Sequence, residues 1–182
     1  MIRTLDLIFS LLGLILALPF LLILFIISLF DTGSPLFKQE RVGRNKKLFV
    51  LIKFRTMKVD TASVATHLAN PSSITPFGHL LRKTKLDELP QLRNVLTGDM
   101  SLVGPRPGLS NQEKLTQARS AKNVYSIRPG ITGLAQVNKI DMSSPELLAK
   151  TDKEMIDSLT LRLYFKYILM TIIGSGSGDR IK

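Results

Sequence analysis

The sequence contains no cysteine and only 2 histidines among its 182 residues. The absence of cysteine excludes disulfide bonds and zinc sites built from thiolates, and it is compatible with a cytosolic domain. His67 and His79 match no catalytic pattern, so we expect each to be structural or solvent-exposed. The chain also lacks internal repeats, and the length that follows its first thirty residues suits one compact domain.

Acidic residues are scarce as well, because 14 Asp and Glu face 25 Lys and Arg, for a formal net charge of +11. A dense part of this excess lies between residues 38 and 58, where Glu40 is the one acidic side chain. A basic flank directly after an apolar run is typical of the cytoplasmic side of a membrane and of contact with anionic lipids. Nucleic-acid binding ranks low, because no recognised nucleic-acid motif accompanies the charge. We therefore expect membrane lipids, and no nucleic acid, as partners.

The apolar run itself extends from Leu7 to Phe30 without a charged residue. As a helix it is long enough to cross a hydrocarbon core of about 30 Å. It is longer than the ~7–15 residue core of a cleavable signal, and no small-residue cleavage site follows it. Pro19 lies near its middle and predicts a kink or a break. Hydropathy leaves two geometries open, a kinked helix that spans the membrane and a helix-break-helix hairpin that returns to the same face.

The segment from Lys85 to Gly108 carries the strongest chemical signal. Its pattern predicts a short helix that begins near Asp87 and Glu88, with Pro90 in its first turn and Gly98 as its C-terminal stop. A helix N-terminus favours an ionised carboxylate and a bound phosphate, and two adjacent carboxylates can hold a divalent cation. A proline-clamped arginine, at 105–107, follows within about twenty residues. The segment therefore indicates phosphate chemistry, although a capping Asp followed by a dipole-favoured Glu has the same local pattern.

The remaining elements predict a small, helix-rich α+β fold. We expect a strand or two over 47–56 after a turn at 43–45, a helix from Thr75-Pro76, a turn at 128–130, a short strand over 131–137, and a helix from 144–146 to about 159. The apolar stretch 161–173 is either a core helix or a helix in the headgroup region with aromatic side chains at the interface. The Gly/Ser-rich tail at 174–182 reads as flexible, and a lid over the substrate is its alternative role.

Four motifs that follow the apolar segment in a fixed order resemble the bacterial sugar transferases, which are monotopic polyprenyl-phosphate phosphoglycosyltransferases: FKQERVGRN, KFRTM, LDELPQLRNVLTGDMSLVGPRP and RPGITGLAQV. The resemblance covers nearly the whole chain, whose length is similar to the family's minimal catalytic unit. It implies transfer of a phosphosugar from a UDP-sugar to undecaprenyl phosphate through a covalent aspartyl intermediate, with release of UMP, at the start of surface glycan synthesis. It also implies Mg²⁺, a re-entrant N-terminal helix, and a catalytic domain on the cytoplasmic face of the bacterial inner membrane. Whether the protein is a homodimer stays open.

The family's roles carry over to matching positions. Asp87 matches the nucleophile, and Glu88 matches the second carboxylate of the family's dyad. Whether Glu88 acts as a general base or positions the metal or the substrate stays open. Both are the expected metal ligands. The resemblance and the basic motifs together suggest these substrate-binding residues: Lys53, Arg55, Pro105, Arg106, Pro107, Arg128 and Asp152.

Two positions depart from the family pattern. Leu18 precedes the break at Pro19, where relatives often have serine, and Met155 replaces the tyrosine of the Asp-x-x-Tyr element that begins at Asp152. We expect a membrane segment over 1–32, a catalytic domain over 33–173 with its interfacial helix at 161–173, and a tail over 174–182. The alternatives are a direct-displacement transferase or nucleotide-sugar pyrophosphatase, and a non-enzymatic membrane scaffold for glycan enzymes. The sequence does not identify the sugar.

Overall fold

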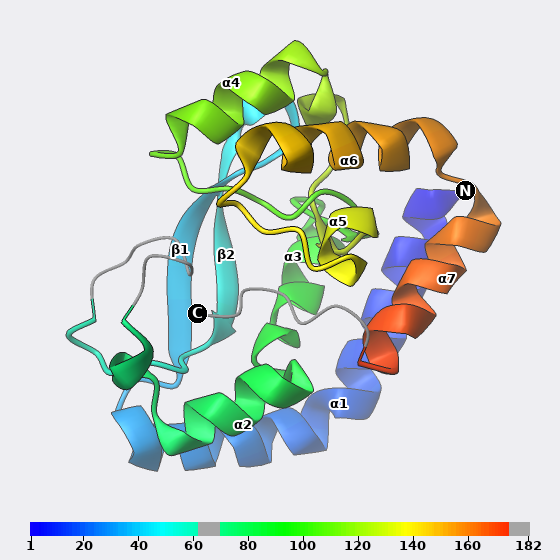
Figure 1. The fold of residues 1–182 in the computed structure, drawn as a ribbon. Coiled ribbons are helices and arrows are strands. Elements are labelled where there is room, and N and C mark those ends of the chain that lie inside the picture. The colour runs from blue at the N-terminus through cyan, green and yellow to red at the C-terminus, as the bar shows by residue number, and fades with distance from the viewer. Residues whose placement is uncertain (62–69, 175–182) are drawn as a thin grey trace.

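The computed structural model describes residues 1–61 and 70–174 and confirms the helix-rich α+β class (Figure 1). Its elements, with η for short 3₁₀ turns, are α1 (Ile2–Thr32), β1 (Leu36–Val42), η1 (Arg44–Lys46), β2 (Leu48–Phe54), η3 (Pro71–Ser73), α2 (Pro76–Thr84), η4 (Leu86–Glu88), α3 (Gln91–Thr97), β3 (Ser101–Val103), α4 (Glu113–Ala121), η5 (Val124–Ser126), β4 (Gly130–Thr132), α5 (Leu134–Val137), α6 (Pro145–Ser158) and α7 (Leu161–Ile172). His79 lies exposed on α2, whereas His67 and tail residues 175–182 lie outside the described residues.

The apolar run forms one helix, α1, that stays helical through Pro19. Figure 1 shows its ribbon changing direction about midway, so the helix lies along two sides of the domain. Of the two geometries that the sequence left open, the structure has one continuous, bent helix and not a pair of helices separated by a break. A proline removes one backbone hydrogen bond and crowds the preceding turn, which bends a helix that neighbouring hydrogen bonds still hold together.

Both halves of α1 pack on the rest of the protein. Ile2 and Leu5 contact a core cluster that includes Tyr164 of α7. Further along, Leu24 is buried in a second cluster with Phe54 at the end of β2. The outer face of the helix is apolar and exposed, and α1 is the one helix among the described residues that is long and apolar enough to cross a membrane.

Polar bonds fix the two ends of α1 to the same domain. The buried carboxylate of Asp6 accepts hydrogen bonds from the Ser101 hydroxyl at 2.8 Å, the Leu102 N–H at 3.0 Å and the Tyr164 hydroxyl at 2.8 Å. At the other end, the Thr75 hydroxyl donates to Asp31 at 2.7 Å. An unpaired carboxylate would be costly to bury, so these partners account for an acidic residue at the start of an apolar helix.

The predicted strand at 47–56 is confirmed as β2, which pairs with β1 in an antiparallel hairpin. The turn between them is the one expected at 43–45, where Asn45 has a φ of 54°. The helix predicted from Thr75 is confirmed as well, since the Thr75 hydroxyl accepts from the Gly78 N–H at 2.9 Å. β1 itself was not predicted, because its polar and apolar residues do not alternate clearly.

β3 and β4 form a parallel pair in which Ser101 lies opposite Gly130. The approach is so close that a Cβ on Gly130 would lie 2.0 Å from the Gly104 nitrogen, so a glycine is required there. The strand predicted over 131–137 is wrong beyond Thr132, because residues 134–137 form the short helix α5. This pairing brings the GPRP segment beside the RPGITG segment, which is distant in sequence.

The helices predicted near the C-terminus are confirmed as α6 and α7. On α7, Tyr164 and Tyr167 are buried in the core, as the core-helix alternative predicts for this side of the helix. Phe165 and Leu169 stay exposed, and the Phe165 ring contacts Phe9 of α1 edge to face at 5.9 Å between centroids. One side of α7 therefore serves as core, and the other extends the apolar surface of α1.

Candidate active site

The two adjacent carboxylates lie in η4, a 3₁₀ turn that connects α2 to α3. Lys85 begins this turn in a left-handed conformation, with a φ of 58°. The predicted helix therefore begins later than expected, at Gln91, and Pro90 is its N-cap rather than a residue of its first turn. Its C-terminal end at Gly98, with a φ of 92°, is confirmed.

Asp87 is buried, with only 7% of its surface exposed. Burial and, next, the charge of Glu88 raise the pKa of Asp87 from 3.8 to about 7. The expectation that a helix N-terminus keeps this group ionised is therefore wrong, because α3 begins four residues later and desolvation dominates. Because its pKa is raised, the Asp87 carboxylate is a stronger base than an ordinary carboxylate.

Three cations oppose this rise by lowering the pKa of Asp87, in the order Lys53, Arg82 and Arg106. Lys53 comes from β2 and Arg106 from the loop after β3, so both predicted cations do meet at the carboxylates. Arg82 was not predicted. Its position on the last turn of α2, five residues before Asp87, was the available signal, and its Nε atom donates to the Thr56 hydroxyl at 2.8 Å.

Arg106 forms an ion pair with Glu88, with its Nη2 atom 2.8 Å from Oε1 of the carboxylate. Both side chains are partly exposed, at 18% and 14%. The dyad is therefore asymmetric, since Glu88 has a direct cationic partner while Asp87 is held in a less polar environment. This asymmetry separates the two carboxyl groups chemically, although they are neighbours in sequence.

The backbone of the Pro-Arg-Pro segment is held by two other arginines. Arg119 donates from Nη1 to the Arg106 carbonyl at 2.8 Å, and Arg41 donates to the Pro107 carbonyl at 3.0 Å. Arg119 is 1% exposed and is paired with Asp152, whose Oδ2 lies 2.7 Å from Nη2 of the arginine. Burial raises the pKa of Asp152, and Arg119 opposes that rise. Asp152 thus supports Arg119 behind the loop and does not itself reach the carboxylate dyad.

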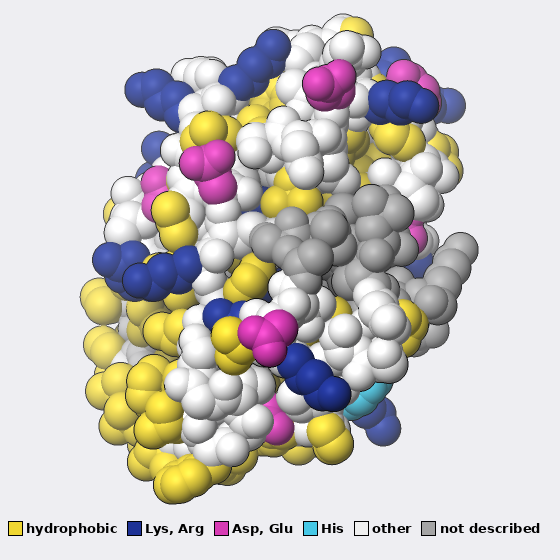
Figure 2. Space-filling model, turned by 90° about the vertical axis from the view of Figure 1, so that its left-hand side faces the viewer, with side chains coloured by type: hydrophobic (Ala, Val, Ile, Leu, Met, Phe, Trp, Pro, Cys, Tyr) yellow, Lys and Arg dark blue, Asp and Glu magenta, His cyan; other side chains and the backbone are white. Residues whose placement is uncertain are grey.

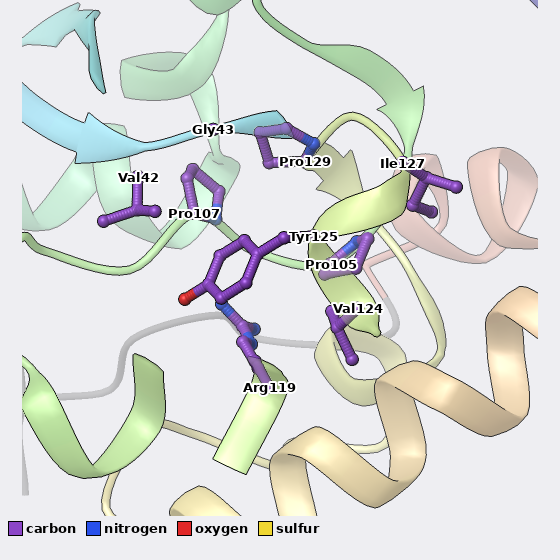
Figure 3. A pocket seen from close by; sticks show the side chains of 9 residues that line it. All are labelled: Val42, Gly43, Pro105, Pro107, Arg119, Val124, Tyr125, Ile127 and Pro129. Carbon is purple, nitrogen blue, oxygen red and sulfur yellow. The ribbon is translucent and has the colours of Figure 1, made fainter. Parts of the chain in front are cut away.

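Figure 3 shows the cavity behind this loop, with Pro105 and Pro107 on its wall beside Arg119 and the Tyr125 ring. The cavity is narrow and mostly apolar. The two prolines fix the loop from the side of this cavity, so their role here is to shape the backbone that presents Arg106. Met155, at the position of the family's tyrosine, fills core space near Gly133.

Two predicted binding residues have structural partners away from the carboxylates. Arg55 donates from Nε to the Ser34 carbonyl at 3.0 Å and lies over the Phe37 ring at 5.3 Å. Arg128 donates to the Gly98 carbonyl at 2.7 Å and so closes the end of α3. The structure therefore does not bring these two side chains into the cluster around Asp87.

The carboxylate dyad also suits a divalent cation in part. Among residues 1–61 and 70–174, no group of three or more Asp, Glu or His side chains could hold a metal. Mg²⁺ is typically bound through one or two carboxylates together with substrate phosphates and water. Asp87 and Glu88 fit that pattern, and their mutual repulsion, which contributes to the raised pKa of Asp87, is what a divalent ion would relieve.

Comparison with known proteins gives the same family as the sequence motifs. The family model described as bacterial sugar transferase matches residues 1–176. The chain is 42% identical over 141 residues to the uncharacterized sugar transferase EpsL of Bacillus subtilis, covering 77% of this chain and 69% of EpsL. It is 37% identical over 180 residues to the UDP-glucose:undecaprenyl-phosphate glucose-1-phosphate transferase of Caulobacter vibrioides, covering 93% of this chain and 67% of the relative.

A third relative is the UDP-galactose-lipid carrier transferase of Erwinia amylovora, 40% identical over 153 residues. That match covers 75% of this chain but only 32% of the longer relative. The chain therefore belongs to the bacterial sugar transferase family, and it spans about a third of its longer relatives.

Proposed function

We propose that the protein is a phosphoglycosyltransferase that moves a phosphosugar from a UDP-sugar to undecaprenyl phosphate. The observation that carries this proposal is the buried Asp87 beside Glu88, within the field of Lys53, Arg82 and Arg106. A carboxylate that is more basic than an ordinary Asp is suited to attack phosphorus, and the cations are suited to bind the phosphate oxygens. Relatives named as undecaprenyl-phosphate transferases support the substrate class.

In the proposed first step, a carboxylate oxygen of Asp87 bonds to the β-phosphorus, and the bond from that phosphorus to the bridging oxygen breaks. The electrons leave with UMP, whose phosphate charge Arg106 and Lys53 would stabilise. In the second step, an oxygen of undecaprenyl phosphate attacks the same phosphorus and releases the Asp87 carboxylate. Mg²⁺, held by Asp87 and Glu88, would neutralise phosphate charge during substrate binding.

The proposal is tested by mixing the protein with UDP-sugars in the absence of lipid acceptor. Intact-protein mass spectrometry should show a phosphosugar adduct and an equivalent of UMP, and Asp87→Asn should show neither, because an amide is a poor nucleophile. UMP release that occurs only when acceptor is present would indicate direct displacement. Release from Asp87→Asn at the parent's rate would contradict the assignment of the nucleophile.

We further propose that α1 enters and leaves the cytoplasmic leaflet from the same side. The support is that Asp6 and Asp31, near opposite ends of the helix, bond to one domain, so a spanning helix would have to separate partners that are in contact. Figure 2 shows hydrophobic side chains gathered at the lower edge of the molecule, where α1 lies. Such a surface is suited to the hydrocarbon boundary.

The topology can be tested with single cysteines at Thr4 and Thr32 in this cysteine-free chain. Both should be protected from a membrane-impermeant thiol reagent in intact cells and should react after the cells are opened. Labelling of the Thr4 position alone in intact cells would show that the helix spans the membrane.

A further inference from the structure

A groove of about 320 Å³ opens beside the carboxylate dyad. Its walls come from η4, α3, the β3–β4 pair and α7, and they are largely aliphatic, with Leu89, Leu92, Ile131 and Ile168 among them. Thr132 and Thr171, which line it too, are hydrogen-bonded to each other through their hydroxyl groups. The groove therefore offers few polar partners to a ligand along most of its surface.

One wall of the groove belongs to the proposed active site. Glu88, which lines the groove, is the residue that pairs with Arg106 at 2.8 Å, and Lys85 lies on the same wall. An anionic group held by these cations would therefore lie where the groove meets the carboxylate dyad. The cations make this wall suitable for a phosphate, whereas the aliphatic side chains suit what is attached to that phosphate.

Another wall joins the apolar exterior. Ile172, on the last turn of α7, lines the groove and is 77% exposed. Leu92 lies against α1, since its Cδ1 would be 3.2 Å from a Cβ placed on Gly13. On the same helix, Phe165 contacts Phe9 of α1, whose outer face is apolar. A continuous path thus leads from the charged site through the aliphatic groove to the apolar outer surface.

We infer that this groove binds the first isoprene units of a polyprenyl phosphate, an assignment that rests on the proposed function. A sugar is a poorer occupant, because hydroxyl groups buried against aliphatic walls would lose their hydrogen bonds to water. The volume lies at the low end of the 300–1,000 Å³ that small-molecule sites occupy, so only the part of the tail next to the phosphate fits. The rest of the tail continues over the apolar face of α1.

Two matched substitutions test the groove kinetically. Ile172 and Ile173 are neighbours with almost equal exposure, 77% and 73%, but only Ile172 lines the groove. Ile172→Asp should raise the KM for a long-chain polyprenyl phosphate, relative to the KM for the UDP-sugar, by about tenfold or more, because a carboxylate would face the hydrocarbon tail. Ile173→Asp should change this ratio by no more than about twofold. Equal effects of both variants would overturn the assignment.

A second experiment reads binding without turnover, so it can be interpreted even if the proposed reaction fails. Farnesyl phosphate with a diazirine on its terminal isoprene is photolysed with the full-length protein, and the labelled peptides are mapped by mass spectrometry. Labelling at Leu89, Ile131 or Ile168 is the expected result. Labelling confined to the outer face of α1 would overturn the inference.

Discussion

Replacing Asp87 by asparagine should stabilise the protein, and the gain should depend on pH. Asp87 has its pKa raised from 3.8 to about 7, first by burial and then by Glu88, so the folded protein favours the neutral carboxyl more than the unfolded chain does. As pH rises above 3.8, the unfolded chain ionises and its free energy falls, whereas the folded protein begins to ionise only near 7. Stability is thus lost between these values and is level above them.

The size of the effect follows from the two pKa values. Each pKa unit corresponds to about 1.4 kcal/mol, so the rise from 3.8 to about 7 costs about 4 kcal/mol of stability at pH 8. At pH 5 only the first part of that interval has been crossed, so the cost is smaller, about 1–2 kcal/mol. For a chain of this size, about 2–4 °C of Tm per kcal/mol gives a gain on the order of 10 °C at pH 8 and of a few degrees at pH 5.

The assay is thermal unfolding of Asp87→Asn and the parent in detergent with EDTA, from pH 5 to pH 8. Asp60→Asn, at an exposed position, is the matched control and should shift Tm by the same small amount at every pH. Asp87→Asn should also lack UMP release, so a single substitution gains stability and loses function. A Tm difference that is constant with pH, or that grows toward pH 5, would refute the electrostatic reasoning.

Three further predictions concern the loop, its support and the membrane helix. Arg106→Lys should lower turnover at least about tenfold, because the planar fork is lost, whereas Lys46→Ala should change it little, because an exposed charge contributes weakly. Asp152→Asn should reduce unfolding free energy by about 3–5 kcal/mol by leaving Arg119 buried and unpaired; the double variant Arg119→Met/Asp152→Leu should recover stability in urea titrations but not activity. Pro19→Ala should straighten α1 and lower activity, with greater thiol labelling near residue 4 in intact cells; unchanged activity and labelling would show that the bend does not depend on proline.

Local chemistry made several elements predictable. The apolar run, the Thr75-Pro76 start of α2, the Gly98 end of α3 and the aliphatic pattern of β2 all depend on neighbouring residues, which the sequence displays directly. The candidate nucleophile and Arg106 were found because adjacent carboxylates and a proline-clamped arginine are unusual neighbours. The family resemblance extended those assignments to Lys53, which the structure brings to the same cluster.

Long-range contacts decided what the sequence could not. Arg119 and Asp152 are 33 residues apart, and nothing local shows that they pair behind the Pro-Arg-Pro loop. Arg55 and Arg128 looked equivalent to Arg106 by charge, but backbone carbonyls that only the folded chain brings near them take up their side chains. Sequence spacing therefore does not predict which of several arginines will lie beside the carboxylates in the folded protein.

The sequence by itself determined that this chain has an apolar helix, a basic flank and a carboxylate–arginine site, because periodicity, charge and residue type are local properties. The tertiary structure decided the state of that site. Burial raised the pKa of Asp87, and partners from α7 and β3 made Asp6 acceptable in the interior. Solvation and hydrogen-bond pairing are set by atoms from distant segments, so they exist only once the chain has folded.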